Sequence, residues 1–181
     1  MGGIQQNTNM KPLKEATHDK HKEAERMPFN VKMFKGELTT EQYGWYLRSQ
    51  LNIFKTIEDN FELPHKGLSR VEAVAFDLMS LGINELVCDE ATRDYLEYLK
   101  GLSQESVNAH IYLNYLAIMF GGQMMKKNTP GPGKMYDFEN MRECMESVRK
   151  IQKDEWADEV NKGFDFMIKI FKNLEGCLIT N

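Results

Sequence analysis

Apolar side chains recur at helical spacing along most of the chain. Between Thr39 and Phe61 they return every three or four residues, which is the period of an amphipathic helix. No stretch alternates apolar and polar residues over a length that would make a half-buried strand. A last helix is predicted by apolar residues that step by four, four, three, four and three positions, namely Trp156, Val160, Phe164, Met167, Phe171 and Leu174. The pattern predicts an all-α protein.

Local signals place the ends of the first helices. Proline suits the first turn of a helix, and the residue before a proline avoids helical geometry. The first helix should therefore begin near Lys11–Pro12 and end before Pro28. Residue pairs three apart predict capping boxes at the next two helix starts. These pairs are Thr39 with Gln42 and Ser69 with Glu72, and Gly82 should end the second of these helices.

Consecutive glycines interrupt a long helix later in the chain. Asp89 should cap a short helix, and the helix after Ser103 meets Gly121 and Gly122 before it continues to Lys127. Because glycine has no Cβ, we expect the backbone to bend there. Residues 128–134, NTPGPGK, predict a loop, and two more helices follow it, the first over about residues 137–150.

The composition is that of an ordinary globular protein. The 181 residues are 41% hydrophobic and 28% charged, and we expect one helical domain over residues 11–181 behind a polar, flexible N-terminus of residues 1–10. No apolar run approaches the roughly 20 residues of a membrane span. The net charge of −4 does not favour nucleic-acid binding. Three distant cysteines without a C-x-x-C motif predict a reducing, cytoplasmic location, and a monomer is the expected state.

Three polar residues of the first helix share one face. Lys14, His21 and Glu25 are seven and four residues apart, which aligns them at 3.6 residues per turn. A carboxylate one turn after an imidazole can fix the ring tautomer of a metal ligand. Spacing alone also fits an exposed histidine in a polar helix, and His18 is a competing ligand. Structural or exposed roles are expected for His65 and His110.

The segment from Leu13 to Glu25, LKEATHDKHKEAE, resembles the first-helix signature of haem oxygenases, and that match selects His21 as the proximal ligand. A second family motif, the distal helix, is similar to residues 109–112 followed by Gly121-Gly122-Gln123. The resemblance implies a single-domain, all-α haem oxygenase-like bundle that holds haem between the first helix and a kinked distal helix.

The resemblance also implies an activity. Haem would be both substrate and cofactor, and O2 with electrons from reduced ferredoxin or an NADPH reductase would give biliverdin, CO and Fe2+. A bilin reductase is a possible partner downstream. Residues that match positions against the haem are Lys14, Thr17, Glu25, Met33, Tyr112 and Phe164. Arg142 and Arg149 are the candidates for the second propionate, since arginine suits a carboxylate.

The sequence departs from the family at one distal position. Ile118 stands where the family has an aspartate that takes part in proton delivery, and Ala117 precedes it where glycine is usual. Asn114, one turn earlier, is a candidate to order water in its place. Two alternatives follow: a non-enzymatic haem carrier or sensor on the same fold, and a helical enzyme of the related thiamine-degrading type.

Overall fold

The computed structural model describes residues 10–83 and 89–180, in which the regular structure is helical throughout. The predicted flexible N-terminus, residues 1–10, lies outside this part except for Met10. No helix of the described chain is long and apolar enough to cross a membrane. The α-helices are α2 (Leu13–Ala16), α3 (His18–Glu25), α4 (Pro28–Phe34), α5 (Thr40–Asn60), α6 (Val71–Leu81), α7 (Glu90–Lys100), α8 (Gln104–Met119), α9 (Gly122–Asn128), α10 (Met141–Ile151) and α11 (Ala157–Thr180). Three 3-10 turns connect them, η1 (Lys66–Leu68), η2 (Lys134–Tyr136) and η3 (Asp154–Trp156).

Several helix starts are capped as the sequence predicts. At α5 the amide of Gln42 donates to the Thr39 hydroxyl over 3.2 Å, and the Thr39 amide donates to the Gln42 side chain over 2.9 Å. Asp89 caps α7 and Ser103 caps α8 by accepting from backbone amides. Each cap satisfies amides that the first turn of a helix leaves without partners.

The capping box predicted at Ser69 is wrong. The Ser69 hydroxyl donates to Glu58 of α5, and α6 begins at Val71 without a side-chain cap. Arg70 is buried at this junction, where its guanidinium donates to the carbonyl oxygens of Met135 and Asp137. Ser69 and Arg70 therefore connect α5 and η2 to the start of α6. The bond to Glu58 takes the place of the predicted cap, because the Ser69 hydroxyl is used there.

The single first helix predicted over residues 11–27 is also wrong. It is two helices, α2 and α3, that meet at Thr17, whose hydroxyl donates to the Leu13 carbonyl over 2.9 Å. Hydroxyl bonds of this kind compete with the backbone ladder and bend helices. Pro28 ends this region as expected, but it also occupies the first turn of α4.

The predicted loop and the helix after it also shift. The loop begins after Asn128, which closes α9, and α10 starts at Met141 rather than near Asp137. The chain between them includes η2, whose amides at Lys134 and Met135 donate to the buried Asp77 carboxylate. These long-range bonds hold the segment away from α10.

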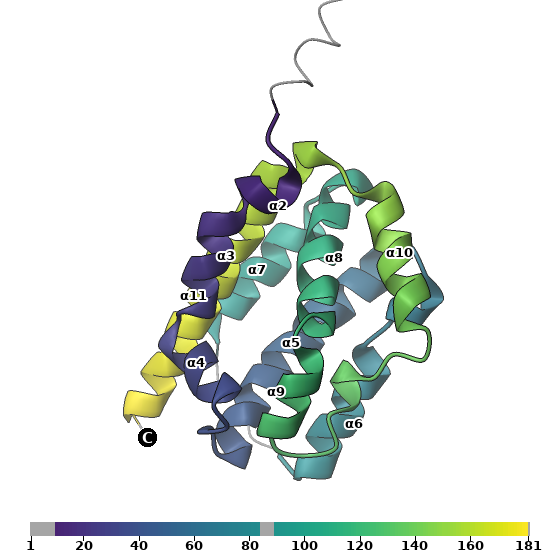
Figure 1. Cartoon of the computed structure of the whole chain (residues 1–181). Helices are drawn as coiled ribbons and strands as arrows, with labels where there is room; N and C mark the ends of the chain where they lie inside the picture. The colour runs from purple at the N-terminus through teal and green to yellow at the C-terminus, as the bar shows by residue number, and fades with distance from the viewer. Residues whose placement is uncertain (1–9, 84–88, 181) are drawn as a thin grey trace, which may run out of the picture.

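Helix α11 is the common support of the molecule (Figure 1), since it packs against α3, α4, α7 and α8. The main apolar core lies chiefly among α5, α6, α7, α8 and α11. A second apolar cluster joins α2, α3, α8 and α11, and it includes Leu113 and Phe164. Helices α3 and α8 both rest on α11, but they share little direct contact with each other.

The long distal segment bends at the glycine pair, as predicted. Helix α8 ends at Met119, and Gly121 has φ +73°, the left-handed conformation that favours glycine. Helix α9 then begins at Gly122, where a Cβ would lie 3.2 Å from the Tyr136 ring. Gly121 is thus required for its conformation, and Gly122 for its closeness to Tyr136.

Candidate functional site

His21 lies on α3 with a carboxylate and an aromatic ring beside it. Its Nε2 is 2.9 Å from the Glu25 Oε1, one helical turn away. Its ring stacks on Phe164 of α11, with centroids 5.4 Å apart and planes 15° from parallel. The imidazole is 55% exposed, whereas Phe164 is buried. A rigid ring on α11 therefore supports an imidazole that remains open to a ligand.

The bond to Glu25 decides which ring nitrogen is available. A carboxylate is an acceptor only, so Nε2 carries the proton of a neutral imidazole in this arrangement. The lone pair is then on Nδ1, and the bond to the carboxylate fixes the orientation of the ring. The predicted pairing of His21 with Glu25 is present, and the role of His21 as a metal ligand stays a prediction.

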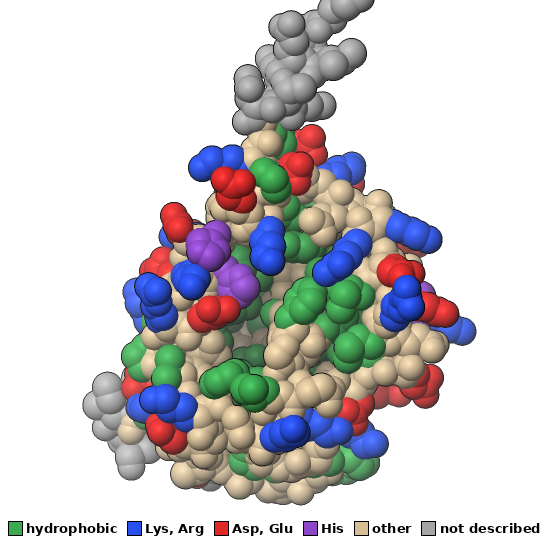
Figure 2. Space-filling model, viewed as in Figure 1, with side chains coloured by type: hydrophobic (Ala, Val, Ile, Leu, Met, Phe, Trp, Pro, Cys, Tyr) green, Lys and Arg blue, Asp and Glu red, His purple; other side chains and the backbone are tan. Residues whose placement is uncertain are grey.

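A cleft lies between α3 and the end of α8, with α11 as its support. Phe164 and Leu113 of α8 belong to one apolar cluster, so the His21 ring that stacks on Phe164 is on the α8 side of α3. Figure 2 shows this face hollowed between the histidines and a group of hydrophobic side chains. We call this hollow the α3–α8 cleft.

The distal side of the cleft is apolar. Ala117 and Gly121 are exposed, and Phe120 is 54% exposed between them. A Cβ built on Gly121 would meet no atom within 4 Å, so the space beside this backbone is open. Ile118 is buried in the main core. The sequence holds no acidic residue from Ser106 to Tyr136, so α8 beyond its first turn supplies no carboxylate to the cleft.

Asn114 belongs to a buried hydrogen-bond network behind α8. Its amide nitrogen donates to the Tyr95 hydroxyl and to the His110 carbonyl oxygen, each over 2.9 Å. The Tyr95 hydroxyl lies 2.6 Å from His110 Nδ1, and His110 Nε2 lies 2.8 Å from Glu159 Oε1. Tyr98 also donates to Glu159. Both protons of the Asn114 amide are thus used inside the protein, and its role in ordering water in the cleft would rest on the carbonyl oxygen alone.

Donors and acceptors in this network match when His110 is neutral. Glu159 accepts from Nε2, and Nδ1 then accepts from the Tyr95 hydroxyl. The hydrogen bond from His110 lowers the pKa of Glu159 below its ordinary value, against the opposing effect of burial. Burial is the main cause of the raised pKa of Tyr95. His110 has the structural role that the sequence predicts, and it joins α7, α8 and α11.

The structure distinguishes the two arginines predicted near the cleft. The Arg142 side chain is 92% exposed and pairs with Glu146 over 3.2 Å. The Arg149 guanidinium lies over the Phe120 ring, 5.8 Å from its centroid, and its charge partly opposes the burial that raises the pKa of Tyr112. Within residues 10–83 and 89–180 no acidic partner is recorded for Arg149. Of these two arginines, Arg149 is therefore the one whose guanidinium lies against the end of α8.

The other predicted contacts divide into exposed and buried groups. Lys14 is exposed on α2, so its ammonium can reach an anion. Tyr112 is half-buried and packs edge-on against Trp156, with ring centroids 6.3 Å apart. Met33 and Thr17 are buried, and the Thr17 hydroxyl is used by Leu13. These last two side chains support α4 and α2 rather than presenting polar atoms to the cleft.

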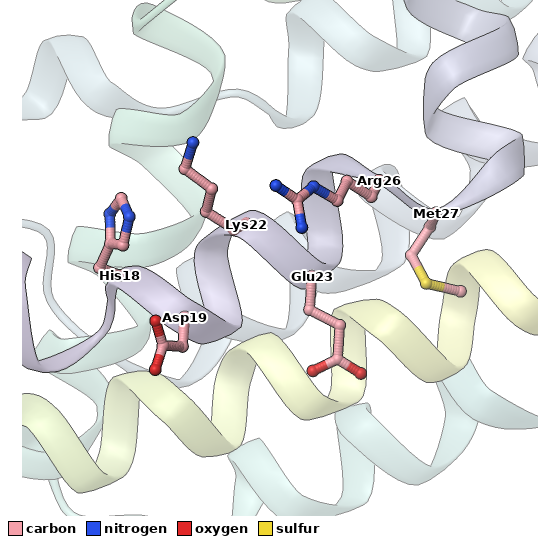
Figure 3. A pocket seen from close by; sticks show the side chains of 6 residues that line it. All are labelled: His18, Asp19, Lys22, Glu23, Arg26 and Met27. Atoms are coloured by element: carbon pink, nitrogen blue, oxygen red, sulfur yellow. The ribbon is translucent and has the colours of Figure 1, made fainter.

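A separate shallow depression follows α3 itself. It is lined by His18, Asp19, Lys22, Glu23, Arg26 and Met27 (Figure 3). Asp19 and Glu23 extend to the side where α11 lies, and His18 and Lys22 extend away from it. Its charged groups come from one helix and His21 is not among them. This depression is distinct from the α3–α8 cleft.

Sequence reasoning missed the exposed ring of Phe120 and the Tyr95–His110–Glu159 network. Phe120 ends the apolar pattern of α8 and reads as one more core residue. The only signal of its exposure is its place beside Gly121, where the helix breaks.

Known proteins of one family are similar to this chain. The Heme oxygenase family model matches residues 8–173. The chain is 32% identical to Heme oxygenase 1 of Gallus gallus over 64% of its own length and 45% of that protein. It is 26% identical to Heme oxygenase 1 of Bos taurus, over 92% of this chain and 71% of that one. The chain thus spans less than half of the first relative and most of the second.

Solved structures of the same family share the fold. Heme oxygenase-1 of the cyanobacterium Synechocystis, in complex with heme, superposes with a TM-score of 0.79 over 93% of this chain and 92% of that one, at 22% identity. The heme oxygenase of Leptospira interrogans gives a TM-score of 0.75 over 88% and 96%, at 23% identity. At these identities the likeness establishes the arrangement of helices.

Proposed function

The chain belongs to the haem oxygenase family, and from this premise we propose that it binds haem through His21 and cleaves it with O2 to biliverdin, CO and Fe2+. The observation that carries the proposal is the half-exposed His21, which is bonded to Glu25 and stacked on Phe164 at an apolar cleft. An oriented neutral imidazole is a suitable axial ligand for haem iron.

The residues around the cleft fit a flat, dicarboxylate ligand. The apolar surface at Phe164, Ala117 and Phe120 suits the macrocycle, and the open space at Gly121 lets a ring approach the backbone. Arg149 would bind one propionate through its planar fork, and Lys14 would meet the other as a point charge. Tyr112 is placed to donate a hydrogen bond beside Arg149.

Bound haem would supply the iron that activates O2, and the protein supplies orientation and exclusion of water. Glu25 keeps the His21 proton on the nitrogen that faces it. The apolar end of α8 limits water at the distal side, and it offers no acidic proton donor of its own. Electrons would come from reduced ferredoxin or an NADPH-dependent reductase, and a bilin reductase would consume the product.

A hemin titration tests the ligand. The wild-type protein should shift the Soret band on binding and show the spectrum of an axial histidine. His21→Ala should lose that spectrum, while His18→Ala, an exposed histidine three residues earlier, should keep it. Equal behaviour of the two variants would show that His21 is not the ligand.

Turnover tests the reaction. With ferredoxin, its reductase, NADPH and catalase, the Soret band should decay as a bilin band appears. A second candidate function, a haem carrier or sensor, is favoured by the buried Ile118 at the distal position of the family aspartate. A Soret band that persists through reduction in air would support the carrier and refute the oxygenase.

A further inference from the structure

Phe120 is an aromatic side chain held at an exposed place by its backbone. It is 54% exposed, whereas the apolar residues that precede it in α8, from Leu113 to Met119, are all buried except Ala117. It caps the C-terminus of α8 and precedes the left-handed Gly121. The helix end and the turn therefore fix the direction in which the ring projects.

The Phe120 ring lies at a rim of the cleft that also carries the Arg149 guanidinium. The Arg149 guanidinium is 5.8 Å from the Phe120 ring centroid, a cation–π contact between α10 and the end of α8. No acidic partner of Arg149 is recorded in the described part of the chain. A carboxylate bound by Arg149 would bring the rest of its molecule against Phe120.

We propose that Phe120 is a specificity-determining residue that contacts the edge of the haem beside the carboxylate held by Arg149, an inference that rests on the proposed function. Haem has its two propionates on one edge. Turning the ring over about the axis that passes between them keeps the propionates in place but exchanges the positions of the methyl and vinyl groups on the other edges. Both faces can therefore enter the cleft with the propionates in the same place. A rigid ring next to one propionate distinguishes them, because the two orientations set different substituents against it.

The consequence concerns how haem binds. The ring contacts the macrocycle edge in one orientation better than in the other, so one orientation should dominate. Arg149 holds a carboxylate in both orientations and cannot make this distinction alone.

Proton NMR of the ferric haem complex tests the proposal without turnover, because each orientation gives its own set of shifted haem methyl signals. The wild-type protein should show one dominant set. In Phe120→Ala the ratio of the two sets should fall about two- to tenfold, the size of one aromatic contact. Phe120→Leu, which keeps apolar bulk, should lie between them. Phe76→Ala is the matched control, since Phe76 is 44% exposed on α6.

The outcomes separate this inference from the proposed function. An unchanged ratio in both Phe120 variants, an equal mixture in the wild type, or the same change in Phe76→Ala would overturn the inference while haem binding stands. Failure of the wild-type protein to bind haem would overturn the proposed function and the inference together. A changed ratio in the Phe120 variants alone supports it.

Discussion

At the scale of single residues, the site depends on which partner each polar group has. His21 is oriented because Glu25 occupies its Nε2 and Phe164 lies under its ring. Arg142 and Arg149 are both exposed, but only Arg149 lacks a recorded carboxylate in the described chain and faces the cleft rim. Chemically identical residues on one helix thus differ in their surroundings, and we expect them to differ in function.

Glu25→Gln should weaken haem binding about tenfold, because loss of the partner that orients a metal-ligating histidine costs about 10- to 100-fold in affinity. The measurement is a hemin titration followed at the Soret band. Glu23→Gln is the control, since Glu23 lies on the same helix and contacts Lys20 instead. Equal affinities of the two variants would contradict a role for Glu25 in orienting His21.

Arg149→Ala should lower haem affinity about three- to tenfold, a modest loss because the side chain is exposed and its charge is screened by solvent. Arg142→Ala should leave the affinity unchanged, since that guanidinium points to Glu146 and solvent. Competition with a haem lacking its carboxylates gives a second measurement, in which the two variants should no longer differ. A larger effect of Arg142→Ala would reverse the assignment.

At the scale of the helices, the bend between α8 and α9 forms the distal wall. The left-handed Gly121 ends one helix and begins the next, so Phe120 projects outward and Ile118 stays in the core. The bend is a property of the backbone and needs no ligand to produce it. The bend therefore shapes the distal wall of the α3–α8 cleft.

Gly121→Ala should lower the free energy of unfolding by about 1–2 kcal/mol, the cost of placing an alanine in left-handed geometry. The cause is conformation alone, because a Cβ there meets no atom within 4 Å. Gly176→Ala, at an equally open position inside α11, should be neutral or slightly stabilising. Urea unfolding followed by circular dichroism compares the two. Similar losses would show that the turn does not require glycine.

At the scale of the whole molecule, one buried network connects the helices that carry the site. Tyr95 of α7, His110 of α8 and Glu159 of α11 are joined by hydrogen bonds of 2.6 and 2.8 Å. Gly163 lets α8 and α11 approach, since a Cβ there would lie 2.5 Å from Leu113. Phe164, the next residue, supports His21. The network thus helps to set the spacing between α8 and the part of α11 that supports His21.

Acid should destabilise the protein in part through Glu159. Its pKa is lower in the folded protein, chiefly because His110 donates to it, so its contribution to stability is complete above the pKa of the unfolded chain. That contribution is lost as the pH falls through the folded pKa. Between about pH 5 and pH 3 the unfolding free energy of Glu159→Gln should therefore fall less steeply than that of the wild type. Parallel curves in urea titrations at several pH values would contradict this linkage.

Features that depend on residues near one another in the chain were predictable from the sequence. The caps at Thr39 and Asp89, the end at Gly82 and the bend at Gly121 follow from side chains within one turn or from glycine itself. The pairing of His21 with Glu25 is of the same kind, because residues four apart meet on one helix face.

Features that depend on contacts between distant segments were decided only by the tertiary structure. The Ser69 hydroxyl donates to Glu58 rather than capping α6, and the Asn114 amide donates to Tyr95. Arg149 rather than Arg142 lies against Phe120 at the end of α8. The sequence by itself determined most of the helices, the bend and the position of His21, since local hydrogen bonding and spacing specify them, but it did not predict the break at Thr17 between α2 and α3. The surroundings of His21 and the exposure of Phe120 were decided by how α3, α8, α10 and α11 pack, because burial and partners exist only once the helices meet.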